Sequence, residues 1–224
     1  TPYIGSHISL YDGAQWRTFS TAEISIAVPA TTSTMYDIFC YSNAGTPTLE
    51  LTAWTNDTTR ATALVYQNGV YVKSGTTTRR YVGSFRTTGV SGQTEDSLAK
   101  RYVWNYYNRV TRRMLVRELT DSWTYTTDAY RLANAATANQ LDAVQGVAED
   151  IVDVIAHGAA GNLTNVYILS GVGLDSTTVN SGHLFASTNT STDGAMRPAI
   201  AIYRDTPSAG RHTYVWLERS QAAG

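Results

Sequence analysis

The acidic side chains of this 224-residue sequence are candidate catalytic residues, because two facing carboxyl groups can cleave a glycosidic bond. Two acidic pairs occur, Glu95-Asp96 and Glu149-Asp150, and the members of each pair are adjacent in the chain. Neighbouring residues of a strand point to opposite faces of the sheet, so adjacent acids do not face one another. In a turn, such acids are usually solvated. Neither pair therefore favours a catalytic dyad.

The histidines could act as metal ligands or general bases, but their spacing supports neither role. The sequence holds four of them: His7, His157, His183 and His212. None belongs to a His-x-His or His-Glu-x-x-His pattern, which would place two imidazoles on one metal ion. We expect histidines that are satisfied at the surface or in turns, while a sandwich fold could still bring His157, His183 and His212 together.

Thiol, serine and phosphate chemistry have equally little support. Cys40 is the single cysteine, which excludes an intramolecular disulfide and a cysteine metal site, and its alternating apolar surroundings predict a buried, inert thiol. Gly171-Val172-Gly173 lacks the third glycine and the following helix of a dinucleotide loop, and no Gly-x-Ser-x-Gly elbow occurs. The sequence predicts no catalytic residue, no cofactor and no metal, and we expect the protein not to be an enzyme.

The densest run of aromatic and basic residues extends from Lys100 to Glu118 and admits two interpretations. It could be a ligand surface for nucleic acid or glycan, or it could form central strands of a β-sandwich. Even positions place Tyr102, Trp104 and Tyr106 on one strand face, whereas a nucleic-acid platform carries rings and cations on the same surface. We therefore predict a scaffold strand and no nucleic-acid partner.

Composition indicates what the surface contacts. The net charge is −1, and among 17 basic residues only Lys73 and Lys100 are lysine, beside 15 tyrosines. Arginine suits planar, packed interfaces better than lysine does, and this profile is typical of a surface that touches other protein. We predict an interface to neighbouring chains at four residues of the aromatic and basic run: Tyr107, Arg109, Arg112 and Arg113.

The elements that must position these residues are strands. Almost every segment alternates with period two between turn clusters, and no apolar run approaches the roughly 20 residues that span a bilayer. We therefore expect no membrane insertion. Hairpins are predicted at Asp12-Gly13, at Asn68-Gly69 and, with the clearest turn chemistry, at residues 205–210. The expected strands are 3–11, 14–19, 23–28, 35–41, 48–54, 64–66, 70–73, 79–87, 100–109, 112–119, 122–127, 140–147, 150–157, 165–174, 183–188, 198–204 and 211–219.

These elements predict an all-β fold, a β-sandwich of the jelly-roll kind with an additional N-terminal antiparallel β region. The segment at residues 87–94 is small, polar and glycine-bearing, and it has no periodicity, so it is the expected boundary. The domains are then residues 1–90, the antiparallel β region, and residues 91–224, the sandwich. No linker is long enough to make them independent, so we expect them to pack together.

Several segments resemble a module that recurs in virion proteins of tailed bacteriophages and in prophage and environmental viral sequences. The resemblance is carried by LTAWTNDTTRATALVYQNGVYVKSGTTTRRYVGSFRTTG, then TEDSLAKRYVWNYYNRVTRR, with LYDGAQWRTF and VGLDSTT also matching. It covers most of the chain, and the blocks WNYYNR and AWTNDTTRA are the distinctive ones. It supplies no catalytic residue.

The resemblance implies a virion structural protein of the appendage type, a tail fibre, spike tip or head fibre that acts in assembly and host-surface attachment. Proteins of this kind are commonly β-sandwich trimers, so the implied partners are copies of the chain in a homotrimer, other virion proteins and a host cell-surface glycan. Two alternatives stay open: a capsid decoration or cement protein, and a glycan-active depolymerase.

Overall fold

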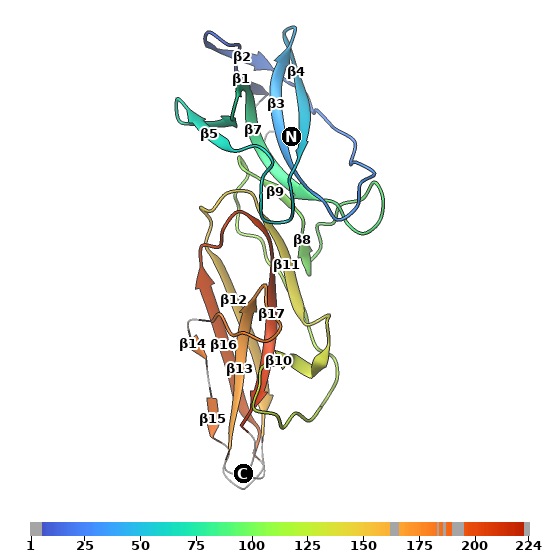
Figure 1. The fold of residues 1–224 in the computed structure, drawn as a ribbon, viewed down its shortest axis with the longest axis vertical. Helices are drawn as coiled ribbons and strands as arrows, with labels where there is room; N and C mark the ends of the chain where they lie inside the picture. The colour runs from blue at the N-terminus through green and yellow to red at the C-terminus, as the bar shows by residue number, and fades with distance from the viewer. Residues whose placement is uncertain (1–5, 162–165, 183, 186, 190–194, 222–224) are drawn as a thin grey trace. The chain divides into compact units, whose positions relative to one another are not determined.

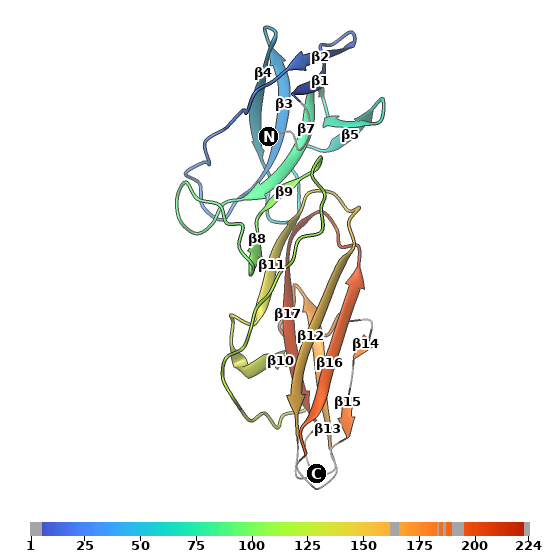
Figure 2. The same ribbon diagram turned by 180° about the vertical axis from the view of Figure 1, so that it is seen from behind.

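The computed structural model describes residues 6–161, 166–182, 184–185, 187–189 and 195–221. Its regular elements are strands, and the single helical element of the described residues is the short 3-10 turn η1, Ala133–Ala135 (Figures 1 and 2). The predicted all-β class is confirmed. The chain divides into two compact units, each with its own core.

The first unit comprises the chain up to Arg113 together with Val144–Val147 and Ser208–Arg211. Its strands are β1 His7–Tyr11, β2 Trp16–Ser20, β3 Met35–Asn43, β4 Thr46–Ala53, β5 Leu64–Gln67, β6 Val70–Lys73, β7 Thr76–Arg86, β8 Lys100–Arg101 and β9 Val103–Asn105. β1 and β2 form a separate hairpin, and the main sheet has the order β4-β3-β7-β6-β5.

Strand β7 is the centre of this sheet because it is hydrogen-bonded along both edges. One edge pairs with β3, and the other pairs first with β6 and then with β9. The hairpins β1–β2 and β5–β6 form where the sequence predicts them, and β3–β4 is a further hairpin between two expected strands. Asn68 and Gly69 both have positive φ, 53° and 81°, as the predicted type I′ turn requires.

The aromatic face predicted for the run from Lys100 to Glu118 packs inward. Tyr102 is 4% exposed and lies with Met35 and Trp54, while Trp104 and Tyr106 pack against the buried pair Phe39 and Tyr81. The first part of the run is less regular than the strand that we expected at residues 100–109. The ladder is interrupted at Tyr102, and β9 ends at Asn105. The Asn105 side chain accepts a hydrogen bond from the backbone of Tyr107.

A buried ion pair lies inside this unit. The Asp37 side chain is 2% exposed, and the Arg60 guanidinium donates to both of its oxygens, at 2.8 and 3.3 Å. Arg60 also donates to the Gly146 carbonyl and lies 4.3 Å from the centroid of the Trp54 ring. The Ser84 hydroxyl donates to Asp37 at 2.7 Å, so the carboxylate is fully hydrogen-bonded although it is out of water.

The second unit comprises Met114–Ala143, Ala148–Pro207 and the chain from His212 onward. Its strands are β10 Arg131–Leu132, β11 Gln140–Gln145, β12 Val152–Ala160, β13 Tyr167–Leu174, β14 Leu184–Phe185, β15 Ser187–Asn189, β16 Arg197–Asp205 and β17 Gly210–Ser220. The first unit includes the last two residues of β11 and the first two of β17.

Two sheets of the second unit face one another as a sandwich. One has the order β15-β13-β17-β11, with β10 also paired to β17, and the other has the order β12-β16-β14. Successive strands from β11 to β17 alternate between the sheets, which is the jelly-roll arrangement. The core between them is made by five buried residues: Ala156, Val172, Ala201, Tyr203 and Tyr214.

The predicted hairpin at residues 205–210 is wrong. β16 pairs with β12 and β14, whereas β17 pairs with β13, so the two strands belong to different sheets. The connecting residues are drawn into the first unit, where the Arg211 backbone donates to the Asp57 carbonyl at 2.8 Å. Residues such as Pro207 and Gly210 lie at the break between the two strands, but they do not specify which strand is the partner of each.

Three expected strands are also absent from the described residues. Residues 23–28, 112–119 and 122–127 have no ladder partner in the structure. Alternation reports which side chains are half-buried, whereas a strand also needs a neighbour for its backbone N–H and C=O groups. These three segments alternate in sequence, but no neighbouring strand pairs with their backbone groups.

The expected boundary at residues 87–94 lies inside the first unit, which continues to Arg113. Thr87 and Thr94 form an antiparallel bridge with one another, so the glycine-bearing segment is a closed loop. Beyond it, β9 adds to β7 and Tyr102 enters the core. Hydrogen bonds and burial therefore keep residues 91–113 with the first unit.

Replacement of Asp37 by asparagine should lower the free energy of unfolding by about 3–5 kcal/mol, because the Arg60 charge would stay buried without its partner. The measurement is urea-induced unfolding of the purified chain. The matched control is Asp153→Asn, whose side chain is 52% exposed and lies 3.9 Å from Arg204. The control should change stability by less than about 1 kcal/mol. Equal effects of the two variants would contradict the structural role of the pair.

Replacement of Gly146 by alanine should cost about 1–3 kcal/mol through overpacking. A Cβ atom at this position would lie 2.2 Å from the Trp104 ring and 2.3 Å from the Tyr81 hydroxyl. Gly89→Ala is the matched control, since nothing lies within 4 Å of its added Cβ atom. Thermal unfolding of both variants tests the expectation, and a Gly146→Ala protein as stable as the control would refute it.

Candidate functional site

The most distinctive surface of the first unit is a chain of rings and guanidinium groups, which we call the aromatic–arginine surface. Tyr66 stacks on Tyr71 with ring centroids 4.0 Å apart, Tyr71 meets Tyr106 at 5.4 Å, and Tyr106 meets Tyr107 at 5.0 Å. Tyr66 is 60% exposed and Tyr107 is 44% exposed. The two arginines of the surface, Arg80 and Arg109, lie over these rings.

Three elements position these side chains. Tyr66 and Tyr71 are directly opposed across the β5–β6 hairpin, so its register brings the two rings together. Tyr106 and Tyr107 follow the end of β9, where the chain turns. Arg80 comes from β7. Its Nε donates to the Tyr107 hydroxyl at 2.9 Å, and its Nη1 donates to the Ser9 carbonyl at 2.6 Å.

Each guanidinium has a defined place on the surface. Arg80 lies 4.5 Å from the Tyr107 ring centroid, and Arg109 lies 5.6 Å from Tyr106 and 5.8 Å from Trp104. Contacts of this length are typical cation–π interactions, which restrict a long side chain and lower the entropy that a partner must remove on binding. Tyrosine and arginine are the residues enriched at the centres of protein interfaces. The arrangement is suited to contact with another protein chain.

The structure places the four predicted interface residues at the surface. Tyr107, Arg109, Arg112 and Arg113 are all exposed. Tyr107 and Arg109 belong to the aromatic–arginine surface, whereas Arg112 and Arg113 follow it along the chain, and the Arg113 carbonyl accepts a hydrogen bond from Arg101. Nothing in the structure tests an interface at these residues, so it stays a prediction.

Sequence reasoning missed Tyr66, Tyr71 and Arg80. A signal existed for the two tyrosines, because each lies two residues from the central positions of the predicted Asn68-Gly69 turn and a two-residue hairpin loop makes them opposite neighbours. Arg80 carried no such signal. It reaches the site only because β7 and the turn after β9 lie together in the folded unit.

The acidic pair Glu95-Asp96 is used in a turn. Glu95 accepts from Lys100 Nζ at 3.1 Å and Asp96 accepts from Arg101 at 3.0 Å. Burial raises the pKa of Glu95, but hydrogen bonds from Ser97 and Lys100 outweigh it and the pKa is lowered. Both acids therefore hold neighbouring cations.

The three described histidines belong to no cluster that could hold a metal ion. His7 and His157 are exposed, His212 is buried in the second unit, and His183 lies outside the described residues. His212 Nδ1 lies 2.7 Å from Asp175, a residue with φ of 54° at the end of β13. Burial raises the pKa of Asp175, but the hydrogen bonds from His212 and the Thr213 backbone outweigh it, so the pKa is lowered. His212 is satisfied by this contact, but it is a buried residue of β17 and not the surface or turn histidine that the sequence predicts.

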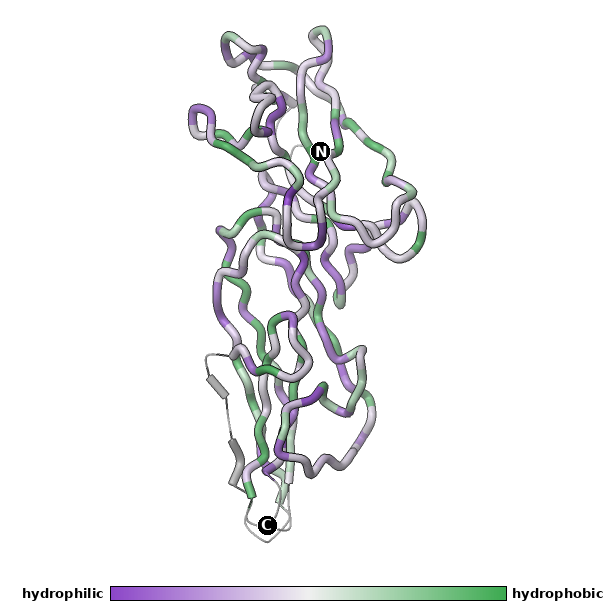
Figure 3. The backbone as a smooth tube through the Cα atoms, in the orientation of Figure 1, coloured by the Kyte–Doolittle hydropathy of each residue, from purple (hydrophilic) through white to green (hydrophobic). Residues whose placement is uncertain are grey.

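Cys40 is 1% exposed, as predicted, and burial raises the pKa of its thiol. Among the residues that the structure describes, no three histidine, cysteine, aspartate or glutamate side chains are grouped to hold a metal ion. Within the same residues no helix is long and apolar enough to cross a membrane, and apolar residues fall in short stretches along the chain (Figure 3). Comparison with protein-family models, with curated proteins and with solved structures finds no match to this chain.

The second unit holds one carboxylate with an unusually low pKa. The Thr120 backbone donates to Glu118 at 2.9 Å, and the side-chain amides of Asn139 and Asn134 donate at 2.8 and 3.2 Å. These hydrogen bonds, that of the Thr120 backbone first, lower the pKa of Glu118 from 4.5 to about 2. The carboxylate orders the turn around η1, where Asn134 and Ala135 both have positive φ.

The low pKa of Glu118 predicts the direction of an acid effect. The unfolded chain binds this proton near pH 4.5 and the folded chain near pH 2, so its stabilising contribution is complete above pH 4.5 and disappears as the pH falls to about 2. Glu118→Gln should flatten that part of the stability profile, measured by urea unfolding between pH 2 and 6. A variant profile parallel to that of the parent chain would contradict this assignment.

Proposed function

We propose that this chain is a structural protein of a tailed-bacteriophage virion, of the appendage type, that assembles with copies of itself and meets the host surface. Three observations support the proposal: the jelly-roll sandwich, an arrangement frequent in capsid proteins and lectins; the lysine-poor surface rich in arginine and tyrosine; and the segments that resemble phage virion modules.

The aromatic–arginine surface carries the proposal. Its rings rest on the buried core around Phe39 and Tyr81, so they are presented on a rigid base. Exposed Val103 and Val110 lie in the same stretch of chain, 41% and 49% exposed, and add apolar area. A rigid surface of tyrosine, arginine and valine has the composition of an interface core, and a second copy of the chain is the partner that the proposal assigns to it.

The polar chemistry of the described residues is consistent with a structural role. Glu95, Asp96, Glu118 and Asp175 each hold neighbouring groups through hydrogen bonds. The buried Asp37 is paired with Arg60. Carboxylates engaged in this way support a framework, and the proposal assigns no reaction to the chain.

The oligomeric state tests the proposal. Light scattering after size exclusion should report a trimer for the purified chain, and the double variant Tyr107→Ala/Arg109→Ala should raise the concentration of half-dissociation by about tenfold or more, the scale of a lost interface hot spot. Arg204→Ala is the control, because its side chain is 67% exposed and lies in the second unit. A monodisperse monomer of the parent chain would overturn the assembly role.

Antibody labelling of particles adds the location. Label on tail or head fibres would support the appendage assignment, whereas label distributed over the capsid shell would replace it with a decoration protein. Unlabelled particles that demonstrably contain the chain by mass spectrometry would place it inside the virion and contradict both.

A further inference from the structure

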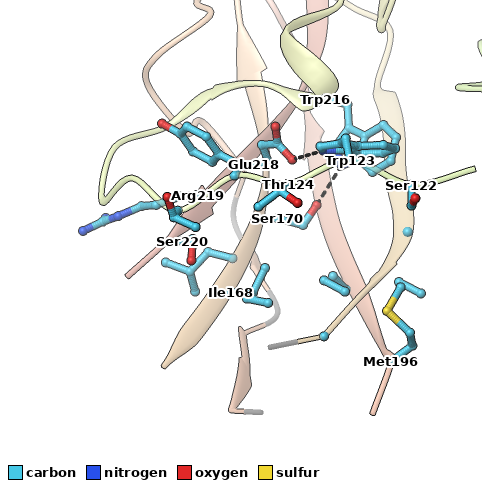
Figure 4. A pocket seen from close by; sticks show the side chains of 18 of the residues that line it. Ser122, Trp123, Thr124, Ile168, Ser170, Met196, Trp216, Glu218, Arg219 and Ser220 are labelled. Carbon is cyan, nitrogen blue, oxygen red and sulfur yellow. Dashed lines mark hydrogen bonds between the residues drawn. The ribbon is translucent and has the colours of Figure 1, made fainter. Parts of the chain in front are cut away.

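A cavity of about 430 Å³ lies in the second unit at one end of the sandwich (Figure 4). The end of β12, the start of β13, the start of β16 and the end of β17 meet there, since Ala159 is opposite Pro198 and Ile168 is opposite Ser220. The segment 121–126, which forms no strand, supplies the remaining wall. The volume is in the range of small-molecule sites.

The cavity exists because the inward positions at this end carry small side chains. Further along the same strands the core is filled by residues such as Tyr203 and Tyr214. At the cavity, the positions are Gly158, Ala160, Ala199, Ser170 and Ser220. Protein interiors are close-packed and voids are destabilising, so a cluster of small inward side chains that leaves a cavity at one end of a sandwich is a departure from ordinary core construction.

Aromatic side chains form the opposite part of the lining. Trp123 and Trp216 meet edge to face with ring centroids 6.0 Å apart. The Trp123 indole N–H donates to Glu218, and the Trp216 indole N–H donates to the Ser170 hydroxyl at 3.0 Å. Both hydrogen bonds are visible in Figure 4. The indoles are therefore oriented by bonds at their edges, and their carbon rings form part of the wall.

Two of the three charged groups at the cavity are matched within the protein. Glu218 accepts from Arg131 Nε at 2.8 Å and from the Asn134 backbone at 3.0 Å in addition to Trp123, and Arg219 donates to Asp128 at 2.7 Å. An anionic ligand such as phosphate gains most from a cation that is not already committed, and the one cation of the lining is committed to Asp128. The third charged group, Asp121, is exposed on the segment 121–126, where its carboxylate can accept hydrogen bonds from a polar ligand.

Hydroxyl groups around the cavity disfavour a purely apolar ligand. Ser170 and Ser220 are each 3% exposed, and the hydroxyl of Ser170 uses an acceptor position for Trp216, which leaves its O–H free of that bond. The segment 121–126 adds Ser122, Thr124 and Thr126 to the lining. The Ser220 hydroxyl donates to the Gln221 carbonyl at 3.4 Å. A hydrocarbon would take the exposed hydroxyl groups of Ser122, Thr124 and Thr126 out of water without offering them a partner, at a cost in binding free energy.

We propose that this cavity binds a neutral saccharide unit. A pyranose ring has apolar C–H faces that lie against indole rings and hydroxyl groups around its edge that exchange hydrogen bonds with serine, threonine and backbone groups. Trp123 and Trp216 supply the ring contacts, and Ser170 and Ser220 supply hydroxyl partners. The site lies in the second unit and shares no residue with the aromatic–arginine surface. As a ligand class for the host-surface contact it rests on the proposed function, whereas sugar binding itself can be tested apart from assembly.

Saturation-transfer NMR and calorimetry with glucose, galactose, N-acetylglucosamine and maltose test the proposal on the full chain. We expect at least one of these sugars to bind with a dissociation constant in the millimolar range or tighter. Trp123→Ala should weaken that binding by about tenfold or more, the scale of a lost aromatic contact, while Trp123→Phe, which keeps a ring without the N–H, should fall between the two.

Two further variants keep the test decisive. Ala160→Val takes up part of the cavity and should weaken sugar binding without removing any wall, and Trp16→Ala, in the β1–β2 hairpin of the first unit, should bind as the parent chain does. The proposal fails if no sugar of the panel binds, or if Trp123→Ala and Ala160→Val bind as tightly as the parent. Light scattering on the same samples reports the oligomer separately, so either proposal can fail alone.

Discussion

One charge pair holds the first unit together, because it joins parts of the chain that no hairpin connects. Arg60, in the loop after β4, reaches Asp37 on β3, the ring of Trp54 and the carbonyl of Gly146. The approach of Trp104 and Tyr81 to Gly146 leaves no room for a side chain there. Replacing both residues of the pair by apolar residues could keep the packing, whereas replacing one of them leaves a buried charge without its partner. The pair therefore fixes how these segments are placed more than it adds net stability.

The strand pairings that could be predicted are those between strands adjacent in the chain, whereas strands such as β12, β13, β16 and β17 were predicted without their partners. Alternation marks β3, β4, β5 and β6, and turn residues such as Asn68-Gly69 specify their pairing over a few residues. The same signals predicted a hairpin of β16 and β17, and they failed because the connection is held at Asp57 in the first unit. Partner choice there depends on residues about 150 positions away, which no local pattern contains.

The candidate sites divide in the same manner. The inward face of the aromatic run followed from period two, and so did the exposure of Tyr107 on the other face. The rings that complete the aromatic–arginine surface required the hairpin register, and Arg80 required the tertiary fold. The cavity of the second unit was beyond sequence reasoning, because it is made by small residues on four strands, and small residues have no periodic signal of their own.

The alternation of strands between the two sheets of the sandwich has a consequence for how this protein is made. Each ladder of the second unit joins strands with another strand between them in the chain: Val152 pairs with Asp205, and Ile168 with Ser220. Loop closure must precede every such contact, so refolding should be slow compared with helical proteins of similar size. During synthesis, β12 must wait for β16, and the ladder between β11 and β17 must wait for β17, while β13 has only the short strand β15 as a partner until β17 arrives. Their unpaired backbone edges stay open to other chains until then.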